Sequence, residues 1–263
     1  MVSMQTMRPL ILILALCAAA FAAGPDSLEI RVLYDNTSTR PDTQADWGFA
    51  ALVTFRGERL LFDSGTKPDL LLSNMKTLGV DPAAIGQAII SHAHADHFNG
   101  IFKVFPLNRS MKVHFLDAFP DNVFDLADRI GMKPRRITGP EAIAPGVFTT
   151  GPVDGTPVEQ ALVIETAKGL VVITGCSHPG VVKLVEAAEN QRNAKSVRFL
   201  LGGFHMLQQP ESEIVRTVDR LRALGVASVA PSHCTGDAPI RAFEKAYGPR
   251  FSTAGVGRRI VLD

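Results

Sequence analysis

Residues 88–100 read AIISHAHADHFNG, and this stretch places three histidines and one aspartate within the six positions from His92 to His97. The whole chain has only seven histidines. Imidazole and carboxylate groups packed this closely are costly to bury unless a cation is present. Histidine nitrogen and carboxylate oxygen together suit zinc, and also manganese, iron or nickel. The stretch therefore predicts a metal site, against the alternative that these are surface or hydrogen-bonded core histidines.

The spacing of the four side chains suggests how they divide between ions. Segment 87–91 predicts a strand, and residues two apart on an extended chain point to one side. His92 and His94 can therefore close on one ion. Asp96 and His97 follow where the chain bends into a helix start, and they can face a second ion. Four ligands are too few for two ions, so this interpretation requires further ligands downstream.

Three other histidines follow predicted strands in the second half of the chain. His178 lies in TGCSHPG, His233 in PSHCTG and His205 in LLGGFHM. Polar side chains on loops at strand ends are typical of an active site held by a rigid sheet. His114, inside the predicted strand KVHFL, is expected to be structural instead.

The predicted elements alternate hairpins with helical crossovers, in two similar halves. Strands are expected at 28–35, 49–55, 59–63, 87–91, 111–116, 160–166, 170–174, 197–201 and 226–230. Helices are expected at 68–78, 121–130, 180–190, 211–224 and 238–247. This order favours an α/β fold in which two sheets pack face to face with helices outside.

Composition and the N-terminus bear on partners and location. Lys plus Arg is 27 and Asp plus Glu is 26, which gives no electrostatic footprint for nucleic acid or an anionic membrane. Residues 1–23 have the charged start, apolar middle and small-residue end of a secretory signal peptide. Their apolar run is too short to span a bilayer comfortably. We expect an exported protein, periplasmic or secreted, with no stable membrane insertion after signal removal and one domain over 24–263. The sequence carries no signal for an oligomeric state.

Several motifs resemble one family. SHAHADH matches the HxHxDH signature of the metallo-β-lactamase superfamily, and LLFDSG is similar to that superfamily's motif with an aspartate near the site, here Asp63. GLVVITGCSHPG, GGFH and PSHCTG resemble a narrower branch. That branch is related to archaeal β-ribofuranosylaminobenzene 5′-phosphate synthase and is called dihydropteroate-synthase-like. The resemblance covers residues 28–263 and implies a four-layer αββα sandwich with a dinuclear metal site at one edge.

The resemblance also implies a set of ligands. It assigns His92, His94 and His178 to the first metal, and it assigns Asp96, His97 and His233 to the second. The implied cofactors are two divalent ions, Zn²⁺ by preference, with Mn²⁺ or Fe²⁺ as alternatives. Asp63 is expected behind the ligands.

Cys176 departs from the broader pattern of the superfamily, because it stands where a bridging aspartate is usual. It is either a thiolate ligand or a residue behind His178, and we favour the second interpretation. A disulfide between Cys176 and Cys234 is a further alternative for an exported protein.

The expected activity is hydrolysis of a small-molecule ester by a hydroxide that the two ions activate. Asp96 would ligate one ion and hold the hydroxide in line, and His205 would donate to the substrate or leaving group, or only support its loop. The start of the helix after Cys234 and the branch's phosphoribosyl substrate favour a phosphate-containing ester, although Asp237 is also a simple helix N-cap. Alternatives are a transferase like the branch's synthase and a non-catalytic protein that senses a metal or ligand. Residues around Phe119, Pro120 and Phe148 are expected to line the outer groove.

Overall fold

A computed structural model describes residues 27–194 and 196–263 of the 263-residue chain. The predicted signal peptide over 1–23 lies outside the described residues. Within the described part, no helix has both the length and the apolar character needed to cross a membrane.

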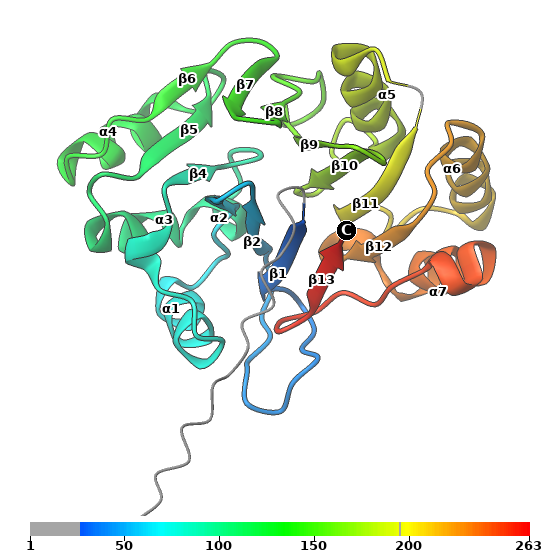
Figure 1. Cartoon of the computed structure of the whole chain (residues 1–263), viewed down its shortest axis with the longest axis horizontal. Helices are drawn as coiled ribbons and strands as arrows, with labels where there is room; N and C mark the ends of the chain where they lie inside the picture. The colour runs from blue at the N-terminus through cyan, green and yellow to red at the C-terminus, as the bar shows by residue number, and fades with distance from the viewer. Residues whose placement is uncertain (1–26, 195) are drawn as a thin grey trace, which may run out of the picture.

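Two sheets form the centre of the molecule (Figure 1). The first has the strand order β13-β1-β2-β3-β4-β5-β6 and the second β12-β11-β10-β9-β8-β7. The strands of the first sheet are β1 (Leu28–Tyr34), β2 (Ala50–Phe55), β3 (Glu58–Phe62), β4 (Gln87–Ile89), β5 (Lys112–Leu116), β6 (Arg135–Ile137) and β13 (Arg259–Leu262). Those of the second are β7 (Glu141–Ala144), β8 (Val147–Thr149), β9 (Leu162–Thr166), β10 (Gly169–Thr174), β11 (Val197–Gly203) and β12 (Val229–Ser232).

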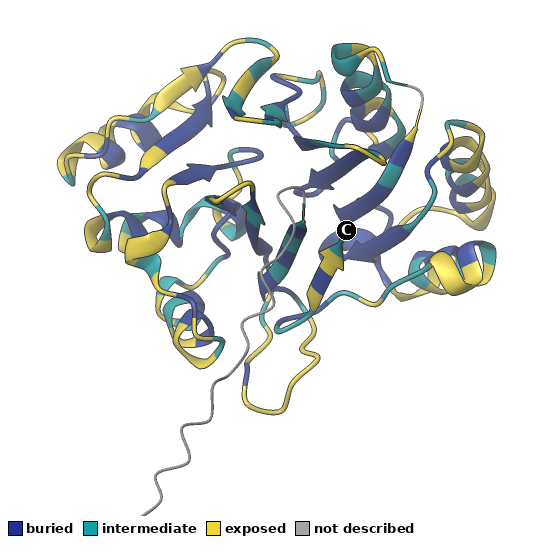
Figure 2. Ribbon diagram, in the orientation of Figure 1, coloured by how far each residue is buried: buried dark blue, intermediate teal, exposed yellow. Residues whose placement is uncertain are grey.

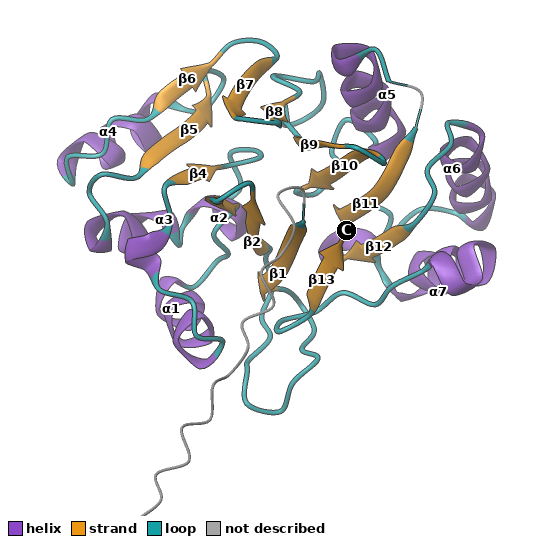
Figure 3. Cartoon of the chain, in the orientation of Figure 1, coloured by secondary structure: helices purple, strands orange, loops and turns teal. Residues whose placement is uncertain are grey.

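Helices cover the outer face of each sheet (Figure 3). The α-helices are α1 (Pro68–Thr77), α2 (Ala95–Phe98), α3 (Ile101–Val104), α4 (Asp121–Arg129), α5 (Val181–Arg192), α6 (Glu211–Ala223) and α7 (Asp237–Tyr247). Four short 3-10 turns lie at η1 (Pro82–Ala84), η2 (Phe105–Leu107), η3 (His233–Thr235) and η4 (Gly248–Arg250). One apolar cluster joins α1, α3 and α4 to the first sheet, and another joins α5, α6 and α7 to the second.

A third apolar cluster lies between the two sheets. On β1, Leu28, Ile30 and Val32 face this cluster, because alternate side chains of a strand point to the same side. A register shift follows Val32, and Leu33 and Tyr34 then belong to the cluster under the helices. Figure 2 shows the result, with buried strands inside and helices whose outer faces are exposed. The predicted αββα sandwich is confirmed.

Four short strands were not predicted from the sequence, namely β6, β7, β8 and β13. Each spans three or four residues and carries charged or half-exposed positions, so the alternation of apolar and polar residues is too short to predict a strand. The helix expected at 238–247 is observed as α7, but Gly236 is its N-cap and Asp237 lies in its first turn. The prediction that Asp237 is the N-cap is therefore wrong.

The topology brings five strand ends to one edge of the sandwich. β3 and β4 run parallel, and so do β10, β11 and β12. Residues that directly follow parallel neighbours lie at the same end of a sheet. The histidine run follows β4, and the loops after β10, β11 and β12 carry His178, His205 and His233.

His114 provides a pH test of the core of the first sheet. Its side chain in β5 is 3% exposed, and its Nε2 lies 3.0 Å from Gln87 Oε1. Burial, with the positive charges of Arg135 and Lys112, lowers the pKa of His114 to about 4. An unfolded chain binds this proton near pH 6.5, so the native state loses stability as the pH falls from about 6.5 to 4.

We expect this residue alone to remove about 3 kcal/mol of unfolding free energy across that range, at about 1.4 kcal/mol for each pH unit. Thermal unfolding of the wild type and of His114→Gln from pH 7 to pH 4 checks this. The variant should lose less stability than the wild type, and equal losses would contradict the assignment.

Candidate metal centre

Three imidazoles from two loops form the first ligand group, which consists of His92, His94 and His178. Their ligand nitrogens all lie within 4.8 Å of one another. The ring centroids are 4.7 Å apart for His92 and His94, 4.8 Å for His92 and His178, and 4.7 Å for His94 and His178. His92 is buried, His178 is half-buried and His94 is exposed, so the triangle opens to solvent on one side.

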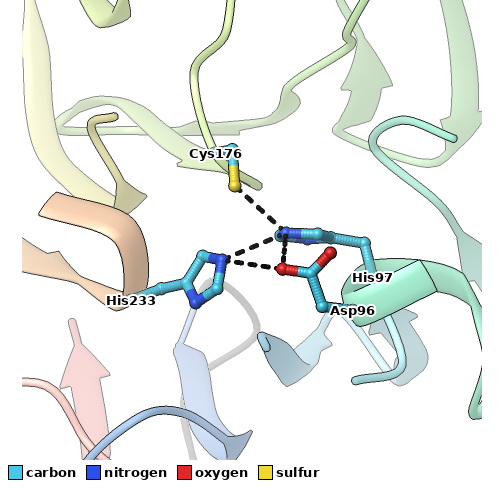
Figure 4. A group of neighbouring side chains, drawn as sticks. All are labelled: Asp96, His97, Cys176 and His233. Carbon is cyan, nitrogen blue, oxygen red and sulfur yellow. Dashed lines mark hydrogen bonds and ion pairs between the residues drawn. The ribbon is translucent and has the colours of Figure 1, made fainter. Parts of the chain in front are cut away.

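The second ligand group consists of Asp96, His97, Cys176 and His233, whose ligand atoms converge (Figure 4). His97 Nε2 lies 3.2 Å from the Cys176 sulfur and 3.2 Å from His233 Nε2. Asp96 Oδ2 is 3.6 Å from His97 Nε2 and 3.4 Å from His233 Nε2. The rings of His92 and His97 are 4.2 Å apart, so the two groups adjoin.

Asp63 orients one imidazole in each group. This fully buried carboxylate lies 2.7 Å from His97 Nδ1, and it accepts hydrogen bonds from the Ser91 amide and hydroxyl. Because the Ser91 hydroxyl donates to Asp63, its oxygen accepts from His92 Nδ1 at 2.8 Å. Both imidazoles therefore keep a proton on Nδ1 and direct Nε2 toward the place where a cation would bind. The aspartate predicted near the ligands lies directly behind them.

Asn36 orients the imidazole of His233. Sequence reasoning did not identify Asn36 as part of the site. Its Oδ1 lies 3.0 Å from His233 Nδ1, and its Nδ2 donates to the His233 carbonyl at 3.1 Å. Its Oδ1 also accepts from the Gly48 amide. The loop after β1 thus fixes the ring that the loop after β12 supplies.

Burial and mutual repulsion keep most of the imidazoles neutral. Burial, with the charges of neighbouring imidazoles, lowers the pKa of His92 well below its ordinary value and that of His178 to about 3. Burial also acts to lower the pKa of His97, but the charge and hydrogen bond of Asp63 raise it to about 9. Burial acts to raise the pKa of Asp96, but His233 and His97 hold it below its ordinary value. Neutral imidazole and ionised carboxylate are the forms that bind metal.

The Cys176 sulfur lies inside the second ligand group rather than behind His178, which favours the thiolate alternative over the one preferred from the sequence. Cys176 and Cys234 are both buried and both free, and the Cys234 thiol donates to the Cys176 carbonyl at 3.4 Å. The structure therefore contains no disulfide between them. Hydrogen bonding with Cys234 and burial raise the pKa of Cys176, so its ionisation requires a cation nearby.

Glu159 holds the loop that presents Cys176 and His178, and sequence reasoning missed it as well. Its Oε1 accepts hydrogen bonds from the amides of Gly175, Cys176 and Ser177 at 3.1, 2.9 and 2.9 Å. Its Oε2 accepts from the His178 amide at 2.8 Å. Burial raises the pKa of Glu159 to about 7, against the lowering effect of these amides. One buried carboxylate thus fixes four consecutive backbone positions.

The backbone is strained where it carries these side chains. Asp63, Ser177, His205 and His233 have φ values of 56°, 67°, 51° and 49°. Residues other than glycine rarely adopt such angles, and where they persist the surrounding structure must enforce them. Gly175 is required for a different reason, because a Cβ there would lie 2.1 Å from Ser91 Oγ.

The donor set fits metal ions. His92 Nε2 and His178 Nε2 are buried and have no hydrogen-bond partner among the described residues. Unpartnered buried nitrogens are uncommon, and here they lie in groups that converge. Three imidazoles suit a catalytic zinc with one open position, and a carboxylate, two imidazoles and a thiolate also suit zinc. Sulfur disfavours magnesium, calcium and manganese.

His205 lies beside the ligand groups on the loop after β11. Its ring centroid is 4.2 Å from that of His178, and its side chain is exposed. A hydrogen bond with Cys234 raises the pKa of His205 above its ordinary value. It can therefore carry a proton at the solvent side of the groups.

The residues expected to line the outer groove lie elsewhere. Phe119 is 4% exposed and stacks on Phe115 at 4.8 Å in the core under the first sheet's helices. Phe148 lies under the Arg192 guanidinium at 3.7 Å and packs against the second sheet's helices. Pro120 is exposed at the N-cap of α4. For Phe119 and Phe148 the prediction is wrong, because both side chains are used in packing.

Comparisons with known proteins agree with the geometry. The model of the metallo-beta-lactamase superfamily matches residues 48–233, which is more than half of the chain. A curated relative from Methanocaldococcus jannaschii is 28% identical over 247 residues, covering 77% of this chain and 84% of its own length. That relative is 7,8-dihydropterin-6-methyl-4-(beta-D-ribofuranosyl)-aminobenzene-5'-phosphate synthase.

Two solved structures resemble this chain to different extents. A metal-dependent hydrolase of the beta-lactamase superfamily is 26% identical with a TM-score of 0.75, covering 90% of this chain and 99% of its own. The Zn(2+)-bound PqqB from Methylobacterium extorquens is 11% identical with a TM-score of 0.57, covering 89% of this chain and 100% of its own. The second likeness is one of fold alone.

Replacing Glu159 with glutamine should loosen the loop that carries Cys176 and His178. A glutamine amide offers one acceptor oxygen in place of two, so at least one buried N–H group loses its partner. We expect the free energy of unfolding to fall by about 1–3 kcal/mol and metal affinity to fall about 10- to 100-fold. Chemical denaturation and a competitive chelator titration measure the two effects.

Glu165→Gln is the matched control, because Glu165 pairs with Arg192 at the surface and its side chain is 45% exposed. It should change the unfolding free energy by less than about 1 kcal/mol. Equal effects of the two substitutions would contradict the role of Glu159 in holding the loop that carries Cys176 and His178.

Proposed function

The chain belongs to the metallo-beta-lactamase superfamily, and we propose that it is a metal-dependent hydrolase of a phosphate-containing or other small ester. The observation that carries the proposal is the pair of adjoining ligand groups, whose nearest rings are 4.2 Å apart. Two adjacent ligand groups suit hydrolysis, because a pair of ions held there would supply positive charge for both the attacking and the leaving oxygen.

In this proposal His92, His94 and His178 hold one divalent ion, and Asp96, His97, Cys176 and His233 hold a second. Zinc suits both donor sets, and Fe²⁺ is the alternative that sulfur permits. When bound, the pair of ions supplies Lewis acidity and lowers the pKa of a water to roughly 7.

The protein's own residues would orient the substrate and move protons. The Asp96 side chain is 18% exposed, so it can accept a hydrogen bond from the attacking water on the substrate side. His205 is exposed beside His178, and its raised pKa suits it to donate a proton to the leaving group. Asp63 and Asn36 would hold His97 and His233 in the tautomer that binds metal.

A phosphate group is favoured by the cavity next to the first ligand group. This cavity of 330 Å³ is lined by His178, His205, Lys183 and the start of α5. Gly180 caps α5 without a side-chain hydrogen bond, so the first amides of the helix are free to bind an anion. Glu213 also lines the cavity, but it forms an ion pair with Arg216. The α7 start that the sequence favoured is a weaker candidate, because Asp237 is exposed there.

A transferase and a non-catalytic sensor are the alternatives. The synthase among the relatives supports transfer, and a protein with intact ligand groups that turns nothing over would be a sensor. Export to the periplasm or medium, proposed from the N-terminal pattern, argues against copying the relative's role in synthesis.

The proposal is tested with metal-loaded protein on panels of phosphodiesters, phosphomonoesters, lactones and β-lactams. We expect about two equivalents of bound metal by elemental analysis and turnover on a phosphoester. Chelation should abolish turnover, and His94→Ala should lower kcat/KM by about 10²- to 10³-fold. His114→Gln, in the core, should keep full activity. Turnover that survives complete metal removal would refute the proposal, and full occupancy without turnover would favour the sensor.

Lys183 gives a separate test of the phosphate end. Lys183→Ala should raise KM for a phosphoester about 5-fold or more, with little change in kcat, because it removes one charge from the cavity. Lys168→Ala, in the exposed turn before β10, is the control and should leave both constants unchanged. If the two substitutions behave alike, phosphate does not bind at the start of α5.

A further inference from the structure

Three cavities lie next to one another beside the ligand groups, and neighbouring cavities share lining residues. The cavity of 330 Å³ beside α5 shares His205 and Gln209 with a second of 250 Å³. The second shares Trp47 and Leu207 with a third of 440 Å³ that also contains His233. We call this row of cavities the groove; it extends from α5, beside His178 of the first ligand group, to the loop after β1, beside His233 of the second.

Trp47 and Leu207 are exposed in the half of the groove away from α5. Trp47 is the only tryptophan of the chain and is 48% exposed, and Leu207 is 58% exposed. They come from different loops, after β1 and after β11, and both line the second and third cavities. We call this pair the apolar clamp. Two large apolar side chains exposed at a shared opening point to a ligand that covers them.

The backbone on both sides of Trp47 is fixed. Asp46, before it, pairs with Lys67 at 2.8 Å and accepts a hydrogen bond from Tyr34 at 2.9 Å. Gly48, after it, has a φ of 140°, and a Cβ there would lie 2.6 Å from the Asp96 carbonyl. The indole therefore projects from a rigid segment, with its ring centroid 5.0 Å from that of His233. Such an exposed but ordered ring is prepared for stacking and loses little freedom on binding.

Leu207, the second residue of the clamp, is fixed by its contact with the backbone at Gly236. A Cβ on Gly236, whose φ is 88°, would lie 2.9 Å from both Cα and Cδ1 of Leu207. The loop after β11 thus packs directly on the backbone before α7.

The charges along the groove separate its two ends. The cavity beside α5 has Lys183 and the free amides of a helix start. The second and third cavities have no lysine or arginine in their linings, and the third contains Asp35 and Asp237. An anionic group is therefore favoured at the first end and disfavoured at the clamp. A neutral planar ring suits the indole face, since aromatic rings stack in offset or tilted geometry.

We propose that the apolar clamp of Trp47 and Leu207 binds a neutral aromatic or heteroaromatic ring of the substrate, on the opposite side of the ligand groups from its anionic group. This rests on the proposed hydrolysis of a phosphate-containing ester and narrows its substrate to one that carries a planar ring. The clamp decides affinity for the ring and takes no part in proton transfer.

The test compares two non-hydrolysable ligands with the same head group, 3-phenylpropylphosphonate and 3-cyclohexylpropylphosphonate, in which a linker separates the ring from the anionic group. Because Trp47 is the only tryptophan, the change in fluorescence emission comes from the clamp, and the cyclohexyl ligand controls for a head group that binds near His233, whose ring centroid is 5.0 Å from the indole. The phenyl ligand should change the emission of the metal-loaded protein and bind about 3- to 10-fold tighter than the cyclohexyl ligand. Equal affinities, or binding without any change in emission, would overturn the proposal.

Variants separate the clamp from folding and from the chemistry. Leu207→Ala should weaken binding of the phenyl ligand about 3-fold or more, whereas Leu107→Ala, which removes a leucine side chain that is 53% exposed in η2, should not. By calorimetry, Trp47→Phe should keep the preference for the planar ring and Trp47→Ala should lose it. A dimer in solution that Trp47→Ala dissociates would assign the patch to a second copy of the chain and overturn the proposal.

The binding experiment needs no turnover, so its failure differs from failure of the proposed function. A ring preference without hydrolysis of any ester would refute the hydrolase and keep the clamp. Hydrolysis of aliphatic and aromatic phosphoesters with equal KM would keep the hydrolase and refute the clamp.

Discussion

The arrangement of the ligand groups depends on one buried carboxylate. Asp63 is fully buried, and its positive φ places it where His97 and Ser91 both reach it. A buried charge without partners is strongly unfavourable, so Asp63 constrains its neighbours as much as they constrain it. Through His97 it fixes an imidazole of the second group, and through the Ser91 hydroxyl it fixes His92 of the first. The two groups therefore keep their separation because they share one anchor.

A second constraint connects the sheets at the same edge. Glu159 and Gln160 are adjacent, yet they bind loops of different sheets. Gln160 donates from its amide to Ser91 at 2.9 Å and from its side chain to Ile90 at 2.8 Å, which holds the loop after β4. Glu159 binds the amides of residues 175–178 after β10. A displacement of this short segment would move both ligand groups, so the geometry of the centre is a property of the whole sandwich edge.

The residues that sequence reasoning found differ physically from those it missed. His92, His94, Asp96 and His97 form a local pattern, and the αββα sandwich follows from strand and helix periodicity together with the family motifs. Glu159 has no such signal, because it binds backbone amides 16 to 19 positions away and any sequence offers amides. Asn36 is likewise 197 positions from His233. The position of Cys176 depends on the strained turn at Ser177, which the sequence does not predict. Phe119 does not line the expected groove, because tertiary packing decides which aromatic rings stack in a core.

If the anionic group of the substrate binds at one end of the groove and its ring at the other, the bond next to the ligand groups must lie between them. His205 lines both the cavity beside α5 and the one that Trp47 enters, so it stands where the two halves meet. A substrate with an anionic group at Lys183 and a ring at Trp47 would present the bond between them to His205. Volumes of 330, 250 and 440 Å³ suit the parts of one small molecule rather than a polymer. Specificity would then come from the loops after β1 and β11, while Asp63 and Glu159 hold a centre that need not change with the substrate.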